Sequence, residues 1–123
     1  MHVPPCALVV DDERDLRENI AELLEMEGWS TCMATNGREA LEILGSQRPV
    51  VVLADLMMPV MNGWQLVEAM KRDDALRTIP VIVVSAHPEP PQGVPVVPKP
   101  FRVEQLLAMV ASVTRNGAAM SRA

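Results

Sequence analysis

Five polar residues with reactive side chains stand at the ends of four short apolar runs. They are three aspartates, one serine and one lysine, namely Asp11, Asp12, Asp55, Ser85 and Lys99. If the apolar runs are parallel strands, these side chains gather at one edge of one sheet. Open α/β sheets bind their ligands at that edge, outside the carboxyl ends of the strands.

The three carboxylates and the two facing groups predict a particular chemistry. Carboxylates packed together repel one another and raise their own pKa values unless a cation shares the site. Mg²⁺ suits such a site, because it takes oxygen ligands, usually one or two carboxylates together with waters. The hydroxyl and the lysine indicate that an anion such as a phosphoryl group also binds there. Carboxylates form aspartyl-phosphate intermediates, and phosphoryl transfer mostly needs positioning and charge neutralisation.

Short apolar runs alternate along the chain with segments of helical spacing, which is the pattern of βαβ units and a parallel sheet. The apolar runs predict five strands, over residues 6–10, 30–34, 50–54, 81–84 and 94–98. Helical spacing predicts four helices. The first carries Leu16 to Leu24 and stops at Gly28, the second covers 37–44 and ends at Gly45, the third follows the turn-rich segment 59–63, and the last carries Val103 to Val110.

The segment between Ser85 and the last expected strand cannot form a helix of ordinary length. It has only eight residues, 86–93, and three of them are prolines: Pro88, Pro90 and Pro91. An average helix needs about 11 residues, and each interior proline costs it about 3 kcal/mol. We therefore expect a proline-stiffened loop at this position.

Composition limits the class of protein. The 123 residues are 49% hydrophobic and 22% charged, which is typical of one globular domain. We expect its core over about 6–115 and a tail over 116–123. The net charge of −5 argues against direct contact with nucleic acid. We find no run long enough for membrane insertion and no signal peptide, so we expect a cytoplasmic protein.

With these residues in place, the chain resembles the receiver (phosphoacceptor) domain of bacterial two-component response regulators, in particular the chemotaxis-type single-domain regulators. The resemblance covers about residues 7–113. It rests on four motifs that occur in order, each at the end of an expected strand: the pair Asp11-Asp12, the segment 55–59 (Asp-Leu-Met-Met-Pro) continuing to Met-Asn-Gly at 61–63, Ser85-Ala86, and Lys99-Pro100-Phe101.

The resemblance implies a fold and a set of roles. The fold is a flavodoxin-like doubly wound parallel sheet with strand order 2-1-3-4-5. Asp55 would accept a phosphoryl group from a histidine kinase or phosphotransfer protein, Ser85 would move to hydrogen-bond that group, and Lys99 would pair with its oxygens. Mg²⁺ would be bound by four residues, with the last acting through its backbone carbonyl: Asp11, Asp12, Asp55 and Met57.

The resemblance also implies that the chain is a signalling switch, with at most self-phosphorylation and autodephosphorylation activity. Its output would be altered binding to an unknown downstream protein. The Lys99–Pro100 peptide bond is a candidate for the cis form, which is essentially a proline phenomenon. A stand-alone receiver fits best, and a receiver module of a hybrid histidine kinase remains an alternative.

Two features depart from the family pattern. Members usually carry a helix between the hydroxyl-bearing and lysine-bearing strands, and many have an aromatic residue three positions before the lysine. Here the helix is replaced by the proline-rich segment, and Val96 stands at the aromatic position. We therefore form the hypothesis that the loop 86–93 is itself the moving part or the docking surface.

Several alternatives stay open. A pseudo-receiver, meaning a phosphorylation-independent interaction module, would explain both departures. A Mg²⁺-dependent phosphatase with a nucleophilic aspartate would need a second aspartate two residues later, where this chain has Met57. His87 is interpreted as a loop residue rather than a ligand. Cys6 and Cys32 are interpreted as small apolar residues of two strands, with a disulfide or redox pair as the alternative.

Overall fold

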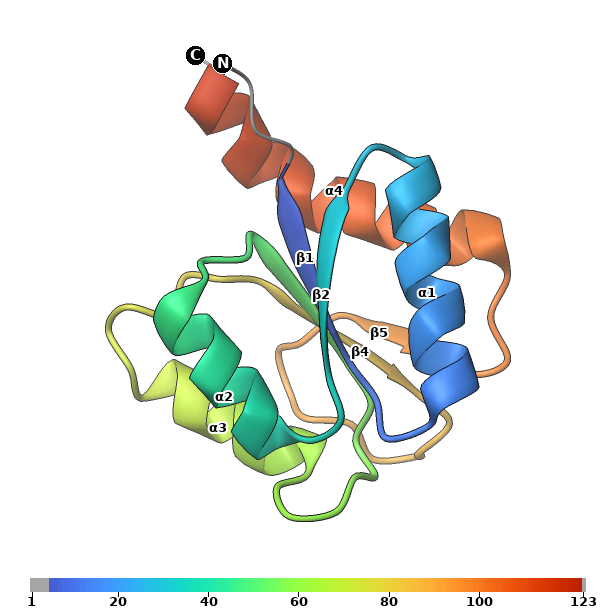
Figure 1. Cartoon of the computed structure of the whole chain (residues 1–123), viewed down its shortest axis with the longest axis vertical. Helices are drawn as coiled ribbons and strands as arrows, with labels where there is room; N and C mark the ends of the chain where they lie inside the picture. Colours follow the sequence, from blue (N-terminus) through green and yellow to red (C-terminus); the bar gives the residue numbers. More distant parts are fainter. Residues whose placement is uncertain (1–4, 123) are drawn as a thin grey trace.

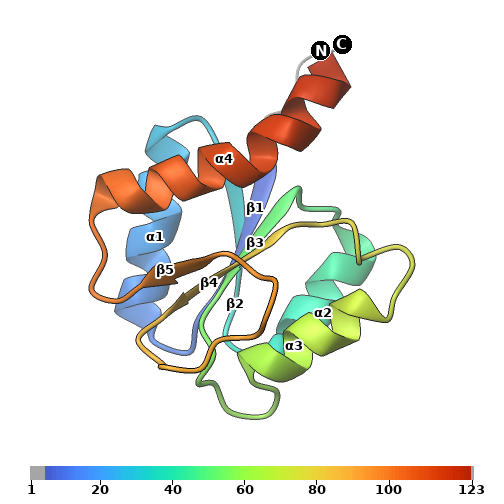
Figure 2. The same cartoon turned by 180° about the vertical axis from the view of Figure 1, so that it is seen from behind.

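The computed structural model describes residues 5–122, and the side chains as far as Thr114. A five-stranded parallel sheet in the order β2-β1-β3-β4-β5 lies between two helical layers (Figures 1 and 2). The strands are β1 Cys6–Val10, β2 Ser30–Ala34, β3 Val51–Ala54, β4 Val81–Ser85 and β5 Val96–Pro98. The helices are α1 Arg14–Met26, α2 Gly37–Ser46, α3 Gly63–Lys71 and α4 Val103–Arg122. The predicted fold class and strand order are confirmed.

Several boundaries differ from the sequence-based expectation. Strand β3 begins at Val51 instead of residue 50, and β4 ends at Ser85 instead of residue 84. Strand β5 begins at Val96 instead of residue 94, and the carbonyl of Pro95, just before it, accepts the Val83 N–H at 2.9 Å. Helix α2 runs through Gly45 to Ser46, because its next residue still donates its N–H to a helical carbonyl. Helix α4 continues to Arg122, through the segment 116–122 that we expected to form a tail.

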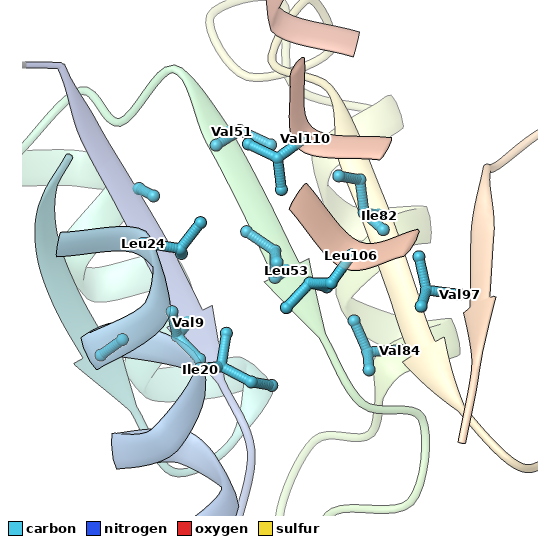
Figure 3. Close-up of a cluster of buried hydrophobic side chains, with 12 residues drawn as sticks. Val9, Ile20, Leu24, Val51, Leu53, Ile82, Val84, Val97, Leu106 and Val110 are labelled. Atoms are coloured by element: carbon cyan, nitrogen blue, oxygen red, sulfur yellow. The ribbon is translucent and has the colours of Figure 1, made fainter. Parts of the chain in front are cut away.

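The core has two halves, because alternate residues of a strand point to opposite faces of the sheet. In β1, Ala7 and Val9 face one layer, and Leu8 and Val10 face the other. The first layer is built from helices α1 and α4, as Figure 3 shows for the buried side chains Ile20, Leu24, Leu106, Val110 and their partners from the sheet. The second layer is built from helices α2 and α3, through Ala40, Leu44, Leu66 and Met70.

No helix lies between β4 and β5, as the three prolines predict. Residues 86–95 form an irregular loop that runs past the N-terminal end of α3 (Figures 1 and 2). At the other end of α3 a hollow of about 370 Å³ remains, lined by Met70, Leu76, Ile79, Val81, Val94 and others. The loop therefore replaces the helix near the carboxyl ends of the strands and leaves the opposite end partly open.

The register of the sheet brings the carboxyl ends of all five strands to one edge. Val10 of β1 is paired with both Ala34 of β2 and Ala54 of β3. Ser85, the last residue of β4, is paired with Pro98, the last residue of β5. Ala54 is in turn paired with Val83 of β4. The polar residues at these strand ends therefore lie within about two residues of one another along the strands, at the same edge of the sheet, as the apolar runs predict.

The two cysteines lie on neighbouring strands with their Sγ atoms 3.3 Å apart, as free thiols. Both are half-buried. Burial, together with the neighbouring Cys6, raises the pKa of Cys32 to about 12, so Cys32 keeps its proton at neutral pH. Cys32 packs against the half of the core that faces α2 and α3. That both cysteines serve as small apolar residues, with a redox pair as the alternative, stays a prediction. Within residues 5–122, no helix has the length and apolar character needed to cross a bilayer.

The start of α3 is fixed against the strand that carries Asp55. Asn62 caps the helix by accepting the Gln65 N–H at 2.9 Å, and the Gly63 N–H donates to the Leu56 carbonyl at 2.9 Å. A methyl group on Gly63 would lie 2.8 Å from the Leu56 Cα and even closer to the Asp55 carbonyl oxygen. Gly63 is thus the residue that lets α3 approach the Asp55 loop.

Replacing Gly63 by alanine is expected to lower the free energy of unfolding by about 1–3 kcal/mol, because backbone atoms must shift to admit the methyl group. Gly45→Ala is the matched control, since nothing lies within 4 Å of the added methyl group. That control is expected to raise stability by about 0.5–1 kcal/mol through helix propensity. Urea unfolding of both variants measures the difference, and equal stability of the two would contradict the close approach.

Candidate phosphoacceptor and metal site

A lysine ammonium bridges two aspartates at the carboxyl edge of the sheet. The Lys99 Nζ lies 3.2 Å from Asp55 Oδ2 and 3.3 Å from Asp11 Oδ2. The side chains of Asp11 and Asp55 are only 3% and 13% exposed, and that of Lys99 is 22% exposed. These contacts span 88 and 44 residues of sequence, so only the folded sheet brings the three groups together.

Backbone hydrogen bonds fix both carboxylates. The ladders of the sheet extend one residue past the strands, because the N–H of Asp55 donates to Val10 at 3.0 Å and that of Asp11 donates to Ala34 at 3.1 Å. The side-chain oxygen Oδ1 of Asp11 accepts the Glu13 N–H at 2.9 Å. In Asp55, Oδ1 accepts the N–H of the next residue at 2.7 Å, and Oδ2 faces Lys99.

The charges of this cluster shift its pKa values. Burial raises the pKa of Asp11, and the charge of Asp55 adds to that effect. The Glu13 N–H and the Lys99 ammonium oppose the shift without cancelling it. For Lys99, burial lowers the pKa, but the two carboxylates outweigh burial and the net shift is upward. Lys99 therefore remains a cation, and the site retains a surplus of negative charge.

That surplus, together with the donor set, fits a divalent cation. Asp11, Asp12 and Asp55 each offer a carboxylate oxygen, and these atoms all lie within 4.8 Å of one another. Asp12 is exposed, so a metal bound there keeps a side open to water, as Mg²⁺ prefers. Met57 lies in the exposed loop after β3, and the role of its backbone carbonyl stays a prediction.

Ser85 is placed beside this cluster, and its side chain is engaged with the loop that follows it. The residue is 4% exposed, and its Oγ accepts the His87 N–H at 3.1 Å. Its backbone carbonyl accepts the Lys99 N–H at 3.2 Å. The bond from Lys99 to Pro100 is cis, as expected. The structure thus brings all the predicted side chains to one edge, with Ser85 turned toward His87.

Sequence reasoning missed two contributors to the site. Arg17 donates to the Asp11 carbonyl at 2.9 Å and holds the start of α1 against the acidic pair. Trp64 contacts His87 and Glu89 in the loop after Ser85. The helical spacing of Arg17 could have suggested a position near Asp11, whereas no local pattern indicates the contacts of Trp64.

Residues 7–111 match the response regulator receiver domain family. The chain belongs to this family. It is 34% identical over 124 residues to the response regulator MprA of Mycolicibacterium vanbaalenii, covering 93% of this chain and 52% of that protein. It is 35% identical over 117 residues to the phosphate regulon transcriptional regulatory protein PhoB of Pseudomonas aeruginosa, covering 89% and 51%. The receiver thus spans about half the length of these curated relatives.

Solved structures agree. The chemotaxis response regulator CheY4 of Vibrio cholerae is 28% identical and superposes with a TM-score of 0.82, covering 90% of this chain and 99% of that one. The signal receiver domain of a histidine kinase from Syntrophus aciditrophicus is 30% identical, with a TM-score of 0.86 and 91% of both chains covered. The resemblance seen in the sequence is confirmed. Receivers act in two-component signalling and typically bind Mg²⁺ in the acidic pocket.

Asp11→Asn is expected to separate stability from metal binding in this receiver. The pKa of Asp11 is raised in the folded state, so its charge lowers stability at pH 7, and the penalty is relieved as the pH falls through that raised pKa. The amide removes the penalty and should raise the free energy of unfolding. The amide should also weaken Mg²⁺ binding by at least about tenfold. Removing a residue that only orients a metal ligand already costs about tenfold in affinity, and removing the ligand itself should cost more.

The measurements are urea unfolding without metal and a Mg²⁺ titration followed by calorimetry. Asp74→Asn is the control, because it removes one negative charge from an exposed carboxylate far from the sheet edge. The control should leave Mg²⁺ affinity unchanged. If both variants bound Mg²⁺ equally well, Asp11 would not be a metal ligand.

Proposed function

We propose that this receiver is a phosphorylation-dependent switch of a cytoplasmic two-component phosphorelay, and that Asp55 accepts the phosphoryl group. The observation that carries the proposal is the Lys99 bridge: a cation lies 3.2 Å from one oxygen of a half-buried aspartate whose other oxygen is held by a backbone N–H. Such a carboxylate is positioned and charge-compensated, the two conditions that phosphoryl transfer needs.

The transfer would run between Asp55 and a phosphohistidine of a kinase or phosphotransfer protein. A carboxylate oxygen of Asp55 forms a new bond to phosphorus, the P–N bond breaks, and its electron pair returns to the imidazole nitrogen. Lys99, kept cationic by its raised pKa, neutralises the oxygens of the transferred group. Mg²⁺, held by Asp11, Asp12, Asp55 and the Met57 carbonyl, would supply further charge neutralisation when bound.

The output proposed for the switch is altered binding to a protein. The net charge of −5 disfavours direct binding of the domain to nucleic acid. Relatives such as PhoB are transcriptional regulators, and they are about twice the length of this chain. The receiver domain of a histidine kinase superposes on this chain with a TM-score of 0.86, against 0.82 for the chemotaxis regulator CheY4. The same switch therefore also fits a receiver module of a hybrid kinase.

A pseudo-receiver is the second candidate, and a specific observation favours it. The 86–95 segment forms no helix, and Val96 occupies the position where many receivers carry an aromatic residue. The usual readout elements are therefore missing from the described structure. A module of this kind would bind its partner without phosphorylation, and its binding would ignore Mg²⁺ and the substitution of Asp55.

The first test is intact-protein mass spectrometry after incubation with Mg²⁺ and acetyl phosphate. We expect a single phosphoryl adduct on the wild-type chain, because Asp55 offers an oriented and charge-compensated carboxylate. The adduct should be absent from Asp55→Asn and absent when Mg²⁺ is omitted. Failure to form it, even with a cognate kinase supplied, would exclude the switch and leave the pseudo-receiver.

Lys99→Ala tests the role of the bridge. We expect this variant to bind Mg²⁺ as well as the wild type, because the carboxylate ligands remain. Its conformational response should be weaker, since no cation then pairs with the phosphoryl oxygens. The response is measured as amide shifts in NMR spectra after phosphorylation, with Lys71→Ala, an exposed lysine of α3, as control. Loss of Mg²⁺ affinity in Lys99→Ala alone would contradict the assignment.

A further inference from the structure

Trp64, the second residue of α3, makes both of its specific contacts with the loop that follows Ser85. Its Nε1–H donates to the backbone carbonyl of Glu89 at 3.0 Å. Its ring lies edge-to-face against the His87 ring, with the centroids 4.6 Å apart and the planes at 83°. A single half-buried side chain thus holds the segment 87–89 from two directions.

The same segment is hydrogen-bonded back to the hydroxyl of Ser85. Ser85 Oγ accepts the His87 N–H at 3.1 Å, and His87 Nδ1 accepts the Glu89 N–H at 3.0 Å. Each side chain therefore binds the amide two residues later, as turn-forming side chains do. Together with the contacts of Trp64, these bonds form an unbroken path from the Ser85 hydroxyl to α3. We call Trp64, His87 and Glu89 the tryptophan clamp.

The tryptophan clamp joins a proline-restricted loop to helix α3, whose position is fixed. Helix α3 cannot shift freely, because Gly63 packs against the backbone that carries Asp55. On the other side, Pro88, Pro90 and Pro91 restrict the backbone of the loop. Motion of the His87 amide is therefore transmitted to the Trp64 contacts instead of being absorbed by a flexible chain.

We propose that Trp64 and His87 are positioning residues of the switch, which hold the Ser85 hydroxyl in its resting orientation and are released when that hydroxyl binds the phosphoryl group. The inference rests on the proposed function, because it takes Ser85 as a phosphoryl contact. A hydroxyl that turns toward the group on Asp55 carries its oxygen away from the His87 amide. The clamp thus takes over the coupling for which other receivers use a helix and an aromatic residue.

The clamp must oppose activation, since any contact made only in the resting state disfavours the phosphoryl-bound state. One neutral hydrogen bond and one aromatic pair are each worth a few-fold in an equilibrium. Removing both should tighten binding of a phosphoryl mimic by roughly tenfold. Removing only the hydrogen bond should have a smaller effect in the same direction.

The first experiment uses the intrinsic fluorescence of the full chain. The sequence has two tryptophans, so Trp29→Phe leaves Trp64 as the single emitter. We expect the emission of Trp64 to change when beryllofluoride, the phosphoryl mimic, is added together with Mg²⁺, because the contact of Trp64 with the His87 ring is lost. Asp55→Asn in the same background should show no change.

The second experiment measures the beryllofluoride concentration at half-saturation, by amide shifts of residues 86–93. Trp64→Phe keeps a ring against His87 and removes the donor, whereas Trp64→Ala removes both contacts. We expect half-saturation at lower concentration in both variants, with the larger shift in Trp64→Ala, and no shift in Trp29→Phe. A merely structural tryptophan would change the unfolding midpoint without tightening the binding.

The outcomes separate this inference from the proposed function. If neither acetyl phosphate nor a cognate kinase leaves an adduct on the wild-type chain, the proposed function fails. If the adduct forms while Trp64 emission stays constant, the clamp is not coupled to the switch and the inference is overturned. Unchanged or weaker beryllofluoride binding in Trp64→Phe would overturn it as well, and this variant retains an aromatic ring that supports folding.

Discussion

The ion pairs of Lys99 with Asp11 and Asp55 are the interaction on which the rest of the site depends. The buried Asp11 and the half-buried Asp55 meet at the end of the sheet, where burial and the charge of Asp55 disfavour the ionised form of Asp11. One ammonium compensates only part of that charge, and the pKa of Asp11 stays raised. A further cation would therefore stabilise the folded site, which fits the acidic pocket of the receiver family.

Keeping these charges together places demands on the scaffold. The parallel register aligns the ends of β1 and β3, so that each aspartate follows a paired strand residue. The core on both faces of the sheet fixes that register, because a slip of one residue would exchange its two buried faces. Helix α3 completes the arrangement through Gly63, whose missing side chain allows the helix to reach the Asp55 loop.

The absence of a helix between β4 and β5 changes how the site is connected to the surface. In its place, the proline-rich loop bonds to Ser85 through a short-range turn, and to Trp64 of α3 through a hydrogen bond that spans 25 residues of sequence. Few contacts are needed to hold this loop in place, because its prolines already limit the conformations of the unfolded chain. It also leaves the hollow at the far end of α3 uncovered. The acidic pocket typical of receivers is thus combined with a loop that is held by Ser85 and Trp64.

The secondary-structure elements and the reactive residues could be predicted from the sequence. Apolar runs that end in Asp11, Asp55, Ser85 and Lys99 predict parallel strands with polar groups at one edge, since strand period and strand direction are local properties. The three prolines likewise excluded a helix after Ser85, because proline acts on its own backbone.

Only the tertiary structure decided which atoms meet. It paired one lysine with two particular aspartates, turned Ser85 toward His87, and brought Trp64 against a loop 25 residues away. The Trp64 contact depends on how α3 packs on the sheet, and the Lys99 pairs depend on the register of the strands; no local pattern records either. The reactive residues of the site can therefore be recognised in the sequence. The contacts of Lys99 and Trp64 that define its resting state are long-range and exist only in the folded chain.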